Sequence, residues 1–189
     1  MAIRPAEPQT HRFTVQQYYQ MGAAGIFDED ARVELIEGEI IEMVPVGAAH
    51  AAIVDRLTHL FASKVKERAI VRVQNPVRLS DLSEPQPDIA LLEFKSDYYS
   101  EAHPGPGDIL LVIEVADTSL KYDRGRKIPL YAQMGIREVW LIDVSGRSVE
   151  VFRAPAGSSY TDIATLPAGE QAAPQALPDI QIGIEEIVP

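Results

Sequence analysis

The chain has 189 residues, of which 46% are hydrophobic, and its 28 acidic residues outnumber 17 Lys and Arg for a formal net charge of −11. This length predicts one domain, 1–189, which can bury roughly 70% of its unfolded surface without disulfides. The absence of cysteine excludes disulfides, thiolate metal sites and cysteine nucleophiles, so any metal must be held by oxygen or imidazole ligands.

The acidic balance counts against a nucleic-acid partner, because proteins that bind polyanions usually carry a basic surface. The surplus lies at the two ends, however, since residues 61–127 carry 10 of the basic residues and 11 acidic ones. The N-terminus lacks the apolar stretch of a signal peptide, and the longest apolar run, 109–113, is far shorter than the roughly 20 residues that cross a membrane. We therefore expect a cytoplasmic protein with no membrane segment.

In chain order, the first part of the sequence predicts a short helix, a hairpin and a longer helix. Thr14 precedes apolar residues at helical spacing and Gly22 follows them, as in a capped helix. The β-rich runs ARVELI and EIIEM flank a tight turn and predict an N-terminal β-hairpin. Residues 47–68 repeat apolar side chains every three or four positions, the period of an amphipathic helix.

The rest of the sequence predicts a sheet and a second helix. Strands are indicated by AIVRV, PVRLS, PDIALLEF, DILLVIEVA, REVWLIDV and SVEVFR, with one more around 160–166. A polar, Pro- and Gly-rich loop covers 95–107. A helix lies within 119–134, where Pro129 would bend it or delay its start. This order predicts an α/β (α+β) fold with a mixed central β-sheet flanked by helices.

Two acidic residues are not explained by the fold alone. Glu114 lies inside the most hydrophobic strand, where an ionised carboxylate is costly unless it is paired or bound to a cation. Asp88 begins the preceding strand, and if the two strands are antiparallel neighbours it lies beside Glu114. Two such carboxylates need a shared proton or a cation, and Mg²⁺ accepts ligands of this kind. The alternatives are a frayed strand end for Glu114 and an ordinary turn for Asp88.

A lysine occupies the apolar face of the second helix. At about 100° per residue, the inward stripe consists of Leu120, Asp123, Lys127, Leu130, Tyr131 and Met134. The ammonium group of Lys127 requires an anion on that face, and Asp88 and Glu114 are candidates. The alternative is a structural ion pair with Asp123, one helical turn away.

Two further residues are weaker candidates. His50 aligns with the apolar face of the 47–68 helix, where a lone histidine is more often structural than a ligand. Glu34 on the hairpin is a similar candidate, whereas the surrounding Glu37, Glu39 and Glu42 are simplest to interpret as a solvated strand face. The sequence contains no Walker-type phosphate loop, G-x-S-x-G elbow or H-E-x-x-H motif.

Taken together, ELIEGEI, His50, PDIALLE, LVIEVADTS, YDRGRK and LYAQMGIREVWLID resemble the Uma-two family of restriction endonucleases, which is widespread in bacteria and belongs to the PD-(D/E)XK nuclease superfamily. The matching segments span about 34–143. The resemblance implies a restriction-endonuclease-like fold and Mg²⁺-dependent hydrolysis of DNA, with Mn²⁺ as a substitute. It implies that Asp88 and Glu114 bind the metal and that Lys127 acts in catalysis.

The sequence departs from the superfamily pattern at Ala116, where the lysine usually stands; Lys127 is interpreted as its replacement, with Asp123 holding it in place. Glu34 and His50 match recurrent family positions. We also expect DNA contacts from the basic middle third of the chain, namely Lys64, Lys66, Arg68, Arg72 and Arg78. A symmetric dimer would bring two active sites to a duplex.

Two alternatives remain. The first is a non-catalytic protein-interaction domain that kept the nuclease fold, which the missing lysine at Ala116 favours. The second is a Mg²⁺-dependent hydrolase of a small phosphorylated substrate, for which an acidic exterior is no disadvantage.

Overall fold

The computed structural model describes residues 9–28 and 30–188. Its strands are β1 (Val33–Ile36), β2 (Glu39–Glu42), β3 (Ala69–Val73), β4 (Ile89–Glu93), β5 (Ile109–Ala116), β6 (Glu138–Asp143), β7 (Ser148–Ala156), β8 (Ser159–Pro167), β9 (Gln171–Ala172) and β10 (Ile182–Gly183). The α-helices are α1 (Val15–Ala23), α2 (Ala48–Val65), α3 (Leu120–Tyr122), α4 (Ile128–Gln133) and α5 (Ile184–Ile187).

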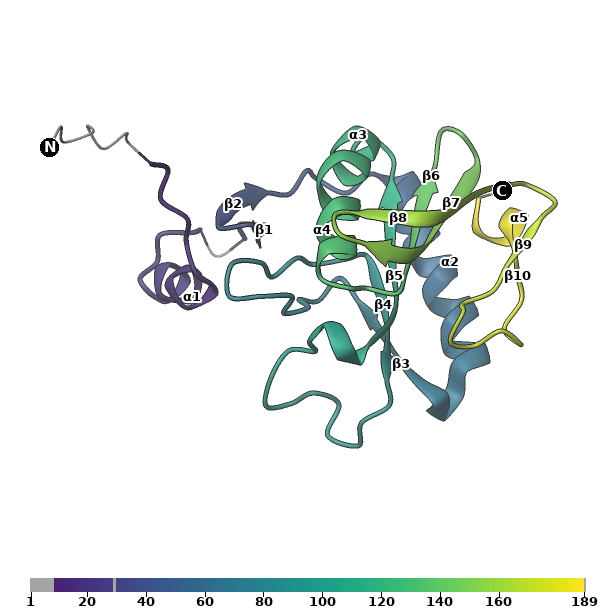
Figure 1. Ribbon diagram of the computed structural model, residues 1–189, viewed down its shortest axis with the longest axis horizontal. Helices are drawn as coiled ribbons and strands as arrows, with labels where there is room; N and C mark the ends of the chain where they lie inside the picture. The colour runs from purple at the N-terminus through teal and green to yellow at the C-terminus, as the bar shows by residue number, and fades with distance from the viewer. Residues whose placement is uncertain (1–8, 29, 189) are drawn as a thin grey trace, which may run out of the picture.

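The centre of the fold is a six-stranded sheet with the order β3-β4-β5-β6-β7-β8 (Figure 1). The β5–β6 pair is parallel and the other four pairs are antiparallel, which confirms the predicted mixed sheet. The predicted strand PVRLS is wrong. Residues 77–80 follow Pro76, and their amide groups bond to loop segments, with Val77 donating to Pro85 and Arg78 to Pro104.

Each face of the sheet carries its own hydrophobic core. On one face, α2 packs through Leu57 and Phe61 together with the C-terminal segment, which contributes Ile184 and Ile187. On the other face, α4 packs through Tyr131. The two layers are visible on opposite sides of the sheet in Figure 1.

The hairpin and the first helix form a small unit on the α4 side of the sheet. The hairpin β1–β2 is a separate two-stranded sheet, and Thr14 caps α1 through a reciprocal bond with Gln17, so both predictions are confirmed. A bridge between Leu35 and Glu84 attaches the hairpin to the loop before β4. This attachment positions the side chains of β1 and β2 beside the end of the central sheet.

The second predicted helix is one helical segment with a π-helical turn, Asp123–Lys127, between α3 and α4. The amide of Ile128 bonds to the carbonyl of Asp123, five residues back. Pro129 has no amide hydrogen and would clash with the preceding turn of a regular α-helix, so the wider turn accommodates it. None of the helices in the described part of the chain is both long and apolar enough to span a membrane.

Candidate active site

Asp88 and Glu114 lie on adjacent antiparallel strands. Ile89 pairs with Ile113 in the β4–β5 ladder, so the same register places Asp88 opposite Glu114. Both are buried, with 9% and 3% of their surface exposed. Glu114 is not at a frayed end, because Val115 continues the ladder with β6. The structure therefore brings these two carboxylates to the same place.

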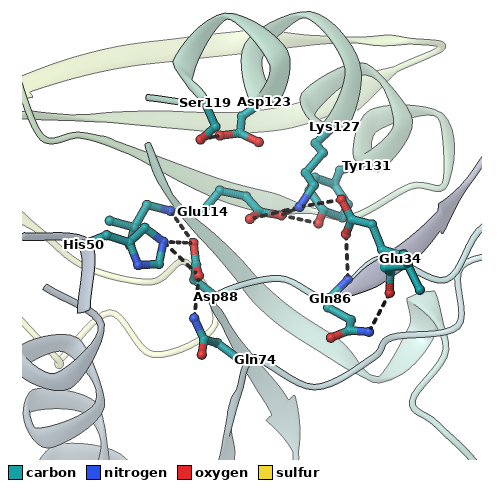
Figure 2. Close-up of polar contacts among 12 residues, drawn as sticks. Glu34, His50, Gln74, Gln86, Asp88, Glu114, Ser119, Asp123, Lys127 and Tyr131 are labelled. Atoms are coloured by element: carbon teal, nitrogen blue, oxygen red, sulfur yellow. Dashed lines mark hydrogen bonds and ion pairs between the residues drawn. The ribbon is translucent and has the colours of Figure 1, made fainter. Parts of the chain in front are cut away.

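Asp88 accepts hydrogen bonds from three directions. The side-chain amide of Gln74 lies 3.1 Å from Oδ1, and the amide of Val115 lies 2.8 Å from Oδ2. Nε2 of His50 lies 3.1 Å from Oδ2 (Figure 2). Burial by itself raises the pKa of Asp88, but these contacts outweigh burial and hold the pKa below its usual value. The hydrogen bond that the His50 ring donates to Asp88 raises the pKa of His50.

Lys127 lies between two glutamates. Its Nζ is 3.3 Å from Oε1 of Glu114 and 3.2 Å from Oε1 of Glu34, and all three side chains are buried. Tyr131 donates a 2.5 Å hydrogen bond to Glu114, and the backbone amide of Gln86 donates to Glu34 at 3.0 Å (Figure 2). Glu34, a weaker candidate in the sequence, therefore belongs to this buried group. The docked hairpin buries this side chain against the lysine.

The alternative ion pair between Lys127 and Asp123 does not form. Asp123 instead accepts a hydrogen bond from Ser119, and its charge reaches Lys127 only at longer range. Burial raises the pKa of Glu114 to about 8, with the charge of Lys127 acting in the opposite direction. Burial also opposes the charged form of Lys127, but the surrounding carboxylates outweigh it and raise the pKa of the lysine. The lysine is thus a fixed positive charge.

These side chains line one cavity of about 440 Å³. Its acidic lining residues are Glu34, Glu42, Asp88, Glu114, Asp117 and Asp123. Its basic residues are Arg32 and Lys127, and His50 also faces it. The connector between β2 and α2 supplies an apolar wall, consisting of Met43, Val44, Pro45 and Val46. All six residues predicted as catalytic or supporting are therefore collected in one place.

The donor set of the cavity fits a partly hydrated Mg²⁺. Within 9–28 and 30–188, no group of three or more His, Asp or Glu side chains is placed to hold a metal ion. Mg²⁺ is usually bound through one or two carboxylates, with water and substrate phosphate as its other ligands. A carboxylate offers about four acceptor positions, and the contacts described above leave part of this capacity free on both Asp88 and Glu114.

The five basic residues predicted to contact nucleic acid do not line the cavity. Lys64 and Arg68 lie near the end of α2 that is remote from His50. Arg68 forms an ion pair with Asp179. Lys64 donates a hydrogen bond to the carbonyl of Gln181. Lys66 is exposed beside them. Arg72 contacts His103, and Arg78 pairs with Asp81.

Four residues at the site were missed by sequence reasoning. Tyr131 was recognised only as an apolar member of the inward stripe, although its hydroxyl contacts Glu114. The hydroxyl of Tyr122 is buried in the cavity lining without a hydrogen-bond partner among the described residues. Gln74 and Gln86 lie in irregular segments, and no sequence pattern marks them. Gln74 has a φ of 48°, a strained value of the kind that often occurs at functional sites.

Comparisons with known proteins agree with this fold. The structure is similar to the crystal structure of a "putative nuclease belonging to DUF820" from Anabaena variabilis ATCC 29413, with a TM-score of 0.73. The two chains share 19% sequence identity over 93% of this chain and 97% of that chain. No curated protein sequence matches the chain. The sequence model of the Uma2 family, described as "putative restriction endonuclease", matches residues 15–185. The chain therefore belongs to the Uma2 family of restriction-endonuclease-like proteins.

Proposed function

We propose that this protein is a Mg²⁺-dependent endonuclease that hydrolyses phosphodiester bonds of DNA. The observation that carries the proposal is the convergence of Asp88, Glu114 and Lys127 on one cavity. Membership of a restriction endonuclease family supports nuclease activity. The residues that match the family pattern are the same residues that burial and charge single out.

Asp88 and Glu114 would hold Mg²⁺, or Mn²⁺ in its place, with water and a phosphate oxygen as further ligands. When bound, such an ion lowers the pKa of a coordinated water and neutralises charge on the phosphate. Neighbouring groups of the protein orient the two carboxylates. His50, Gln74 and the amide of Val115 fix the Asp88 carboxylate by hydrogen bonds. Tyr131 fixes that of Glu114 in the same way.

Lys127 would stabilise the negative charge that grows on the phosphate during hydrolysis. Its ammonium group is held by Glu34 and Glu114 in the absence of substrate, so little reorganisation is needed when that charge develops. Glu34 is thus a positioning residue for the lysine. Asp123, which the family resemblance suggested for this task, bonds to Ser119 instead.

The acidic lining makes the proposed activity depend strongly on the ion. Six acidic side chains face the cavity against two basic ones, so a phosphate group is repelled in the absence of a cation. The overall net charge of −11 acts in the same direction. We expect DNA binding to be weak without a divalent ion and to strengthen when one is added.

The proposal is tested by DNA cleavage with Mg²⁺ or Mn²⁺, on supercoiled plasmid and on single-stranded circular DNA. Asp88→Asn, Glu114→Gln and Lys127→Ala should each abolish cleavage. Asp162→Asn, which neutralises an exposed carboxylate on β8, should leave it unchanged. Cleavage that survives the first three substitutions contradicts the assignment of the site. No cleavage of either DNA by the folded wild-type protein contradicts the function and favours a non-catalytic interaction domain.

A further inference from the structure

We infer that the cavity admits one unpaired nucleotide, so that the substrate of this site is single-stranded DNA or an unpaired segment within a duplex. The inference rests on the proposed function, because it concerns the same carboxylates. It goes beyond that function by specifying which form of DNA can reach them. Depth, size, wall chemistry and charge of the cavity each support it.

The side chains that would act on the phosphate are buried. Asp88, Glu114 and Lys127 are 9%, 3% and 5% exposed. A metal ion held by these carboxylates would act only on a phosphate that reaches them. A single strand can bend a nucleotide into the cavity, whereas paired nucleotides have to leave the stack first, as happens in enzymes that act on extruded bases.

The cavity has the size and the wall of a site for one small organic group. Its volume of about 440 Å³ lies within the range typical of small-molecule sites. The connector between β2 and α2 lines one side with exposed apolar residues, and Val44 and Val46 are 61% and 40% exposed. A polyanion backbone gains nothing from such a wall. The flat face of a base or a sugar does, because contact removes apolar surface from water.

The charge around the cavity disfavours a duplex more than a single strand. Double-stranded DNA carries one negative charge per roughly 1.7 Å of axis, about twice the density of one strand. One bound divalent ion offsets only part of the six acidic side chains in the lining. The predicted basic contacts cannot compensate at this point, since none of them lines the cavity. A duplex would therefore bring two backbones to an acidic opening.

The first test compares a labelled single-stranded oligonucleotide, the duplex with its complement, and a duplex with an unpaired internal loop. We expect Mg²⁺-dependent cleavage of the single strand and of the loop to be about tenfold faster than that of the full duplex, a ratio equivalent to 1.4 kcal/mol. Fluorescence anisotropy with Ca²⁺, a probe of binding rather than of activity, should show the same preference.

The outcomes separate the two claims. Cleavage of the full duplex as fast as the single strand overturns the inference and leaves the proposed function intact. Preferential binding of the single strand without cleavage supports the inference and contradicts the proposed function. Equal binding of both forms, or binding of neither, overturns the inference whether or not cleavage occurs.

The second test probes the apolar wall. Val44→Ser and Val46→Ser change exposed side chains, so both variants should fold, and together they should weaken single-strand binding about tenfold through lost apolar contact. Ile163→Ser is the matched control, because Ile163 is 56% exposed but lies on β8 outside the cavity. Equal affinities for the double variant and the control contradict the role of the wall.

Discussion

The Nζ atom of Lys127 lies 3.3 Å from Oε1 of Glu114, and the two side chains come from opposite sides of the sheet–helix interface. Glu34 contacts the same ammonium group from the hairpin. One buried lysine thus contacts two buried glutamates from two other elements, and the catalytic candidates are also part of what holds the fold together. Substitutions at this point must be judged by stability as well as by activity.

Replacing the lysine should destabilise the protein. Lys127→Met leaves Glu34 and Glu114 buried without their cation, and breaking a buried pair in this way typically costs about 3–5 kcal/mol. Urea denaturation without divalent ions measures the loss. Lys121→Met, at an exposed position in α3, is the control and should change stability by less than about 0.5 kcal/mol. Equal losses in the two variants would show that the buried network is not stabilising.

Divalent ions should bind to the two carboxylates. In calorimetric titrations we expect wild-type protein to bind Mg²⁺ and Mn²⁺, and Glu114→Gln or Asp88→Asn to lose this binding, since each removes a charged ligand. Asp162→Asn, outside the cavity, should bind as the wild type does. Unchanged affinity in both cavity variants would place the metal elsewhere.

Tyr131 should act on the metal through Glu114. Tyr131→Phe removes the hydrogen bond to this carboxylate and should lower metal affinity by about tenfold, as is usual for groups that orient a ligand. Tyr160→Phe is a matched control, because its hydroxyl is bonded to the carbonyl of Ile136 away from the cavity. Both variants should lose about 1 kcal/mol of stability. If both also change metal affinity equally, the effect is one of stability alone.

The lysines predicted to contact DNA should contribute to the binding of long strands only. His50 lies near the start of α2, and Lys64 and Lys66 lie at the other end of this helix. At 1.5 Å per residue, the two lysines are roughly 22 Å from His50. For a long single strand, the double variant Lys64→Gln, Lys66→Gln should have a shallower slope of log K against log salt concentration. The magnitude of the slope should fall by about 1.4. Cleavage of a dinucleotide-sized diester should not change. An unchanged salt slope removes both lysines from the DNA path.

Local patterns were sufficient to predict much of the fold and the positions of the main candidates. The sequence placed Asp88 beside Glu114 on the condition that their strands are antiparallel neighbours, and the β4–β5 pair meets this condition. The helical wheel turned Lys127 inward, and this side chain is 5% exposed. The orientation of Lys127 needed only the helical period, a property of the local chain, whereas the pairing also required that two strands joined by a loop be neighbours.

Features that depend on distant contacts were not predictable in this way. Glu34 is buried because its hairpin docks on the loop before β4, a contact that the hairpin sequence alone does not indicate. The C-terminal segment forms β9, β10 and α5 against α2, although its Pro- and Ala-rich sequence carries no clear period. Residues 77–80 have strand-like composition, but their amide groups bond to loops.

The metal site is tested most directly by a crystal structure of the protein with Mn²⁺, located by its anomalous scattering. We expect one peak between Asp88 and Glu114, with oxygen atoms of both carboxylates at about 2.1 Å, within about 0.2 Å. We also expect Lys127 to stay in contact with Glu34. A cavity without Mn²⁺ at saturating concentration, in which Lys127 still bridges both glutamates, would rule out a metal site at these carboxylates.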